Sequence, residues 1–180
     1  ELDDAAGAGA FLVRGFGCGG ATAAPTAGKK CYAATRQCAA AVDFRASVYV
    51  VMLGTNDAWH RGGEPERVRA GLKELATTFR RGAALVPRLV FVLPPGAKAG
   101  RLEANLREVV HPDIRSLVEE LRGEERGEVV LVAPSLPAPA SYREDLVHLS
   151  VEGAAAIARA VAAGVCPRRA RSRSPAARAA

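Results

Sequence analysis

The sequence lacks several features that would assign it quickly to a class of protein. None of its stretches approaches the ~20 consecutive apolar residues that a membrane-spanning helix needs. It has no C-x-x-C pair, so a structural zinc site is not expected. No secretory signal is recognisable at the start. Because the chain begins at Glu1 without an initiator methionine, we expect a preceding segment, and the residues are compatible with either a secreted or a cytoplasmic protein.

The body of the chain also lacks an excess of either charge. The formal net charge is +6, but it falls to +1 when five arginines near the C-terminus are left out. A near-neutral body does not favour a nucleic-acid surface. We therefore expect one domain over residues 1–165 and a basic, disordered tail over residues 166–180. The alternative for the tail is an arginine–serine segment that binds phosphates or is phosphorylated.

Cysteine is scarce, with four residues in 180. Cys31 and Cys38 are seven positions apart and could form a disulfide bond if the residues between them form a loop. Separate free thiols are the simpler alternative.

Apolar runs and periodicity predict alternating strands and helices. A short helix over residues 32–42 is expected after the first strand. Helices with apolar positions on one face are expected after the second and third strands, and Pro112 should kink or interrupt the last of these. Ser150 is placed to cap a final helix. This alternation favours a parallel sheet with helices on both faces. The expected strands are residues 10–16, 47–53, 88–93 and 128–132, and continuous β-branched runs such as SVYVVML suggest strands covered on both faces.

Polar residues follow several of these strands. Asn56 and Asp57 come directly after the strand that ends at Leu53, and Asp145 and His148 follow the last strand through a loop. In open α/β sheets, functional sites form at the carboxyl ends of the strands, so these residues should converge on one rim.

These residue types suit acyl transfer. His148 can act as a general base because imidazole titrates near neutral pH, and Asp145 can orient it. The side-chain amide of Asn56 and the backbone N–H of Gly20 can donate hydrogen bonds to an oxyanion. Asp57 is expected to hydrogen-bond within its own turn. A nucleophilic serine is expected in a tight turn between a strand and the helix that follows it. None of the serines of this sequence lies in such a turn.

Three segments resemble the SGNH/GDSL hydrolase family. They are VRGFGCGGATA (residues 13–23), VVMLGTNDAW (residues 50–59) and REDLVHLSVEGAAAIARAV (residues 143–161), which are similar to its second, third and fifth sequence blocks. The resemblance implies a three-layer, flavodoxin-like α/β fold with strand order 2-1-3-4-5, in which the first strand is missing here. It also implies that the nucleophilic serine belongs to a Gly-Asp-Ser block that this chain lacks.

The resemblance implies a carboxylic-ester hydrolase with an acyl-serine mechanism and no metal or organic cofactor. The residues in and around the motifs, MLGTNDA and DLVHLSVEG, are most similar to those of the branch that contains carbohydrate O-acetylesterases. The alternatives are a lipid or short-chain ester hydrolase of the same family and a non-catalytic protein of this fold. Without an interior strand and a serine, we expect the chain alone to be poorly stable and inactive.

Overall fold

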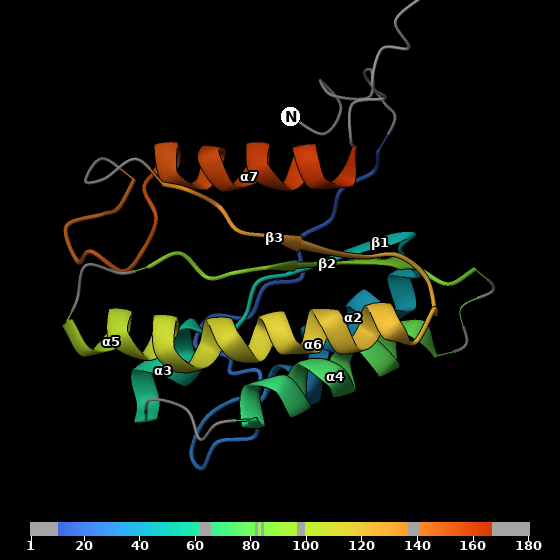
Figure 1. Cartoon of the computed structure of the whole chain (residues 1–180), viewed down its shortest axis with the longest axis horizontal. Helices are drawn as coiled ribbons and strands as arrows, with labels where there is room; N and C mark the ends of the chain where they lie inside the picture. The colour runs from blue at the N-terminus through green and yellow to red at the C-terminus, as the bar shows by residue number, and fades with distance from the viewer. Residues whose placement is uncertain are drawn as a thin grey trace, which may run out of the picture.

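The computed structural model describes residues 11–61, 66–81, 83, 85–96, 100–136 and 141–166 (Figure 1). Its centre is a parallel sheet with the strand order β1-β2-β3. The α/β class expected from the sequence is confirmed. The expectations for residues 1–9 and for the tail beyond Cys166 fall outside the described residues. The strands are β1 (Val48–Val51), β2 (Arg88–Val92) and β3 (Val129–Val132).

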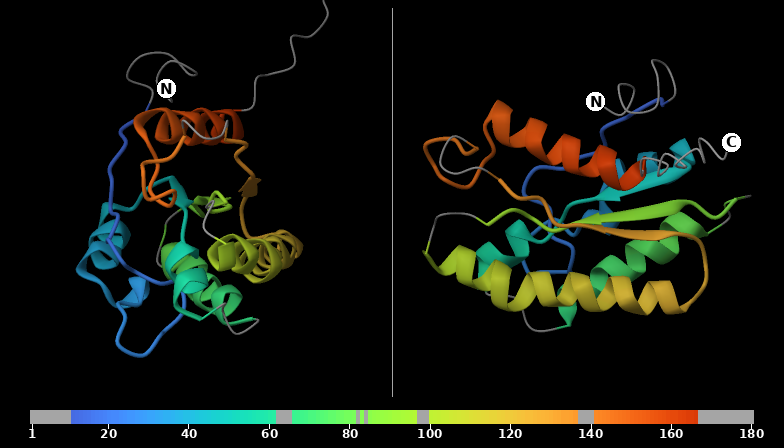
Figure 2. Two further views of the ribbon diagram at one scale, coloured as in Figure 1. Left: turned by 90° about the vertical axis from the view of Figure 1, so that its left-hand side faces the viewer. Right: turned by 45° about the horizontal axis from the view of Figure 1, so that its top comes forward.

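Helices cover both faces of the sheet and give three layers. Helix α7 lies on one face, whereas α2, α4 and α6 lie on the other (Figures 1 and 2). A 3₁₀ turn, η1, precedes α2, and a π-helical turn, η2, joins α5 to α6. The bounds are η1 (Tyr32–Ala34), α2 (Arg36–Phe44), α3 (Thr55–Arg61), α4 (Arg67–Arg80), α5 (Gly100–Asn105), η2 (Leu106–Val110), α6 (His111–Gly123) and α7 (Val151–Val165).

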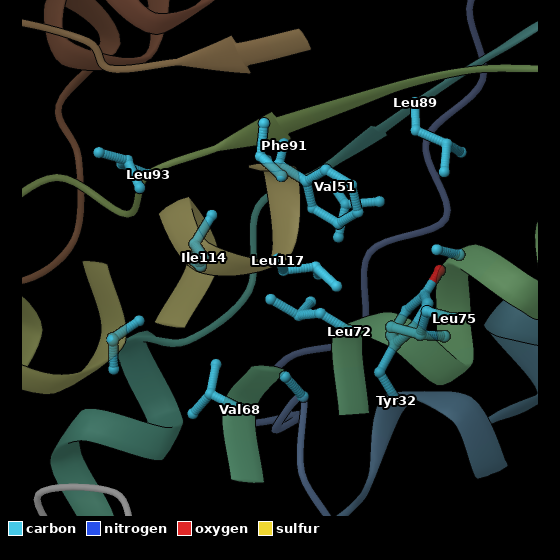
Figure 3. Close-up of a cluster of buried hydrophobic side chains, with 14 of the residues drawn as sticks. Tyr32, Val51, Val68, Leu72, Leu75, Leu89, Phe91, Leu93, Ile114 and Leu117 are labelled. Carbon is cyan, nitrogen blue, oxygen red and sulfur yellow. The ribbon is translucent and has the colours of Figure 1, made fainter. Parts of the chain in front are cut away.

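The sheet divides the core into two apolar clusters. Because successive side chains of a strand point to opposite faces, Leu89 and Phe91 face α4 and α6 while Val90 and Val92 face α7. The larger cluster is shown in Figure 3, where Leu72 of α4 and Leu117 of α6 meet beneath the sheet. The helical faces predicted from apolar spacing are therefore those that pack on the sheet.

The expected strand at residues 10–16 is not formed. Residues 11–16 contain no strand, and the side chains of Leu12 and Val13 are 71% and 64% exposed. A strand is stable only when a neighbour accepts its backbone hydrogen bonds. In the expected strand order that neighbour is the first strand, and the described residues contain no such strand beside this segment.

Strand β1 was expected to be covered on both faces, and this is wrong for one of them. Tyr49 and Val51 are buried, and the Tyr49 ring stacks on Phe79 with the centroids 4.1 Å apart. On the α7 side, however, Val50 is 47% exposed and Met52 is 42% exposed. The apolar run predicted the strand correctly, but α7 extends over β2 and β3 and leaves this part of β1 uncovered.

Pro112 lies at the start of α6, where the π-helical turn η2 gives way to a regular α-helix. The five residues of η2 immediately before α6 form a π-helical turn, which fits the missing N–H and the ring bulk of a proline in the next turn. His111 is held there, with its Nε2–H donating to the Pro94 carbonyl at 2.8 Å. Burial lowers the pKa of His111, so this ring is favoured in its neutral form.

Helix α4 is capped by a residue of another helix. Its own N-cap residue, Glu66, makes no side-chain capping bond. The carboxylate of Asp113 in α6 instead accepts hydrogen bonds from the backbone N–H groups of Glu66 at 3.1 Å and Arg69 at 3.3 Å. One carboxylate therefore satisfies two of the unpaired donors at this helix end and ties α4 to α6.

Removal of this cap is expected to lower stability. For Asp113→Ala we expect a loss of about 1 kcal/mol in the free energy of unfolding, as for other lost caps. Asp43→Ala is the matched control, because Asp43 is an exposed helical aspartate with no side-chain bond among those described. Urea denaturation of both variants measures the difference, and equal midpoints would contradict the capping role.

The four cysteines are free thiols, which agrees with the simpler of the two expectations. Over the described residues, no helix is long and apolar enough to cross a bilayer.

Candidate functional site

The predicted polar residues lie at one end of the sheet. The strands run towards the left in Figure 1, and the loop that precedes α7 and the short helix α3 both lie at that end. The loop carries Asp145 and His148, and α3 carries Asn56 and Asp57. Figure 2 shows the same rim from the side of the strand ends.

Asp145 and His148 form a hydrogen-bonded pair. The Nδ1 of His148 lies 2.6 Å from Oδ2 of Asp145. The other carboxylate oxygen, Oδ1, accepts the backbone N–H groups of Val147 at 2.9 Å and His148 at 2.8 Å. The hydrogen bond to the His148 ring, together with these two backbone bonds, lowers the pKa of Asp145 to about 2. The carboxylate is therefore ionised at neutral pH and holds Nδ1 as the donor, which leaves Nε2 as the proton acceptor.

The backbone of the loop fixes this pair. Tyr142 and Leu149 form an antiparallel bridge, and the Arg143 N–H donates to the His148 carbonyl at 2.8 Å. A turn inside the bridge places Leu146 at a φ of +56°. The N–H of Ser150 then donates to the carbonyl of Ser141 at 3.0 Å. Since its two ends are bonded to each other, the loop presents His148 on a short, closed segment.

The end of this loop continues into α7, where the sequence prediction is confirmed. The Ser150 hydroxyl accepts the N–H of Gly153 at 3.1 Å, as an N-cap does. The side chain of His148 is 74% exposed, so its ring stands at the surface of the rim.

Asn56 lies in the first turn of α3, the helix that follows β1 in the chain. Gly54 makes this tight approach possible: its φ is +122°, and a Cβ there would come within 2.5 Å of Cγ1 of Val110. The Asn56 amide donates through Nδ2 to the carbonyl of Ala21 at 3.0 Å. An amide NH₂ has two hydrogens, so one stays available for a second acceptor.

Gly20 lies in an exposed turn that leads into the segment bonded by Asn56. The Ala21 N–H donates to the Cys18 carbonyl at 3.2 Å, and Gly20 has a φ of +74°. A positive φ at the third residue of a turn strongly favours glycine. This conformation explains why glycine stands at position 20.

Sequence reasoning missed the main contact of Asp57. The side chain is buried, and its two oxygens accept the backbone N–H groups of Ala23 at 2.9 Å and Ala24 at 3.0 Å. These partners are more than thirty residues away, so no local spacing could have revealed them. The sequence signal was only the carboxylate itself, next to Asn56 in a turn.

The described residues offer His148 no nucleophile. No serine or cysteine among them hydrogen-bonds its ring. Ser47 precedes β1 at the opposite end of the sheet. Ser141 is 1% exposed, and the Ser150 hydroxyl is used as the α7 cap. Nor do the described residues contain a group of three or more side chains that could hold a metal ion.

Comparisons with known proteins agree with the α/β fold. A solved structure from Agrobacterium tumefaciens, described as a "putative arylesterase", is 28% identical in sequence to this chain. The match covers 91% of this chain and 83% of that one, with a TM-score of 0.61. None of the curated proteins compared with the chain matches it. A family model described as "GDSL-like Lipase/Acylhydrolase family" matches residues 2–156. The chain therefore belongs to the GDSL-like lipase/acylhydrolase family, with an SGNH-type α/β fold.

Proposed function

We propose that this protein hydrolyses carboxylic esters through an acyl-serine intermediate, with His148 as general base and Asp145 as the residue that orients it. The observation that carries the proposal is the 2.6 Å contact between His148 Nδ1 and Asp145 Oδ2 at the carboxyl rim of the sheet. In the first step, a serine oxygen attacks the ester carbonyl carbon and its proton passes to Nε2 of His148. The same proton then goes to the departing alcohol, and water releases the acid by the reverse sequence.

We propose Asn56 and Gly20 as the donors to the oxyanion. Developing negative charge on the carbonyl oxygen is stabilised most by donors that are already in place. Asn56 is oriented by its bond to Ala21, and the second hydrogen of its amide is left for the substrate. Gly20 offers its backbone N–H from the neighbouring turn.

The nucleophilic serine is proposed to come from outside these 180 residues, on a strand beside β1. The support is the unpaired outer edge of β1 among the described strands, together with Val50 and Met52, which are exposed on the adjoining face. An apolar strand that continues into a helix would pair with the edge and cover these side chains. A serine at the carboxyl end of that strand would reach the same rim as His148.

The first experiment asks whether the chain as given hydrolyses p-nitrophenyl acetate. We expect no turnover above that of His148→Ala, because no hydroxyl within the described part of the chain hydrogen-bonds the ring of His148. Turnover that depends on His148 would contradict this expectation and would point to a nucleophile among the residues of the chain itself.

For the substrate we propose carbohydrate O-acetyl esters, with lipid or short-chain esters as the alternative within the family. The two differ in acyl length and in the alcohol, so an active form of the protein should be assayed on acetylated sugars and on p-nitrophenyl esters of increasing chain length. Preference for the acetylated sugar supports the proposal. A rate that rises with chain length contradicts it.

A non-catalytic protein of this fold is the second candidate, and it is favoured by the lack of a nucleophile beside His148 among the residues that the structure describes. The coding sequence upstream of Glu1 separates the two. A Gly-Asp-Ser motif there supports the esterase, whereas a genuine start near Glu1 excludes it.

A further inference from the structure

We propose that Asp57 is a positioning residue for the oxyanion donors. Its carboxylate fixes residues 23 and 24 to α3, and thereby sets the position of the Gly20 turn relative to Asn56. This inference rests on the function proposed above and adds a residue that sets the geometry of the same site without touching the substrate.

The bonds of Asp57 join two distant parts of the chain. Its oxygens lie 2.9 Å from the nitrogen of Ala23 and 3.0 Å from that of Ala24. With 6% of the residue exposed, the carboxylate is almost fully removed from water. A buried charge is tolerated only when it is well hydrogen-bonded, and bonds to a charged acceptor are about twice as strong as neutral ones. Asp57 therefore binds residues 23 and 24 strongly.

Asn56 holds the same segment on the other side of Thr22. Its amide bonds the Ala21 carbonyl, so consecutive residues of α3 bind residues 21, 23 and 24. Thr22, between these contacts, is fully buried, and its hydroxyl donates to the Ala24 carbonyl at 2.7 Å. The segment is thus fixed immediately after the Gly20 turn.

Helix α4 also contacts this segment. A Cβ on Gly71 would come within 2.2 Å of the Ala23 carbonyl oxygen, so helix and segment already touch backbone to backbone. The segment therefore cannot come closer to α4 at this point, and Asp57 bonds it to α3.

Gly20 itself has few contacts, although Cys18 at the start of the turn packs against the larger core cluster. Gly20 is exposed, and a Cβ there would meet no atom within 4 Å. Its position therefore depends on the residues on either side of it, and the anchored residues 21–24 follow it directly. If the anchor is lost, the Gly20 N–H moves relative to the Asn56 amide, and both must meet one oxyanion.

The test uses Asp57→Asn, which keeps one acceptor oxygen but presents an NH₂ group to the second backbone N–H. In this chain we expect amide hydrogen exchange at Ala23 and Ala24 to become about 10- to 100-fold faster, the change expected for a lost bond to a charged group. Asp43→Asn is the matched control, since Asp43 is an exposed helical aspartate, and exchange in α7 should not change in either variant. If Asp57→Asn does not fold, Asp57→Ser, which keeps one acceptor, carries the same measurements.

The second readout is steady-state kinetics in a form of the protein that carries the nucleophile. We expect Asp57→Asn to lower kcat about 10- to 100-fold with KM nearly unchanged, because the oxyanion donors act on the transition state. Faster exchange with an unchanged kcat would overturn the positioning role and leave a purely structural one. If exchange at Ala23 and Ala24 is unchanged, the anchor itself is refuted. If the form of the protein that carries the nucleophile has no esterase activity, both the proposed function and this role of Asp57 are wrong. The hydrogen-exchange result tests the anchor independently of activity.

Discussion

Replacement of His148 by alanine is expected to lower kcat by about 10⁴- to 10⁶-fold in a form of the protein that carries the serine. In the proposed mechanism the imidazole accepts the serine proton and returns it to the leaving group, so its removal should cause a large loss. Asp145→Asn should cost about 10⁴-fold, since an amide does not hold Nδ1 as the donor and favours the wrong tautomer. Ester hydrolysis at saturating substrate measures both effects.

The control for this prediction is Arg143→Ala. Arg143 lies in the same loop, but its contribution to the loop is its backbone N–H, which alanine retains. A loss in this variant as large as in His148→Ala would show that the loop is merely fragile. Because the pKa of Asp145 is about 2, its carboxylate is lost only as the pH falls towards 2. Protonation of Asp145 should therefore produce no acid limb of kcat/KM above pH 4 in any variant that retains the pair.

The sequence predicted the parts of the fold that depend on local pattern. The apolar spacing of α4 gave its buried face, and the capping role of Ser150 could be seen from its place before an apolar helix. The three strands of the sheet were recognisable as short β-branched runs bounded by turns. In each of these cases the residues that determine the structure lie within a few positions of one another.

The failures have a common physical cause, which is dependence on distant partners. Residues 11–16 have the composition of a buried strand, but a strand forms only beside another strand. The apolar run of β1 could not reveal that Val50 would be left uncovered, because this depends on which helix lies above it. Asp57 finds its partners across more than thirty residues, and the capping of α4 by Asp113 comes from another helix.

For the candidate site, the sequence predicted that these residues share one rim but could not give their fine geometry. Asp145 and His148 are three positions apart, and the structure bonds them directly. Their rigidity comes from contacts outside the motif, through the bridge of Tyr142 and the start of α7.

Gly153→Ala is expected to destabilise the protein by about 1–3 kcal/mol and to lower kcat by about 10²-fold where the nucleophile is present. A Cβ on Gly153 would lie 2.0 Å from the Ser141 carbonyl oxygen, which accepts the N–H of Ser150. Neither side can yield cheaply, because Ser141 is 1% exposed and Ser150 is the helix cap. The loop that ends at this contact must shift, and His148 shifts with it.

The predicted loss of stability is opposite in sign to the usual effect of such a substitution. Alanine is a better helix former than glycine by up to about 1 kcal/mol, so a glycine-to-alanine change inside a helix normally stabilises. Gly123→Ala, at the end of α6, is the matched control because a Cβ there meets no atom within 4 Å. Urea midpoints should therefore move in opposite directions in the two variants. If Gly153→Ala were as stable as Gly123→Ala, the contact between α7 and Ser141 could not be what holds His148 in place.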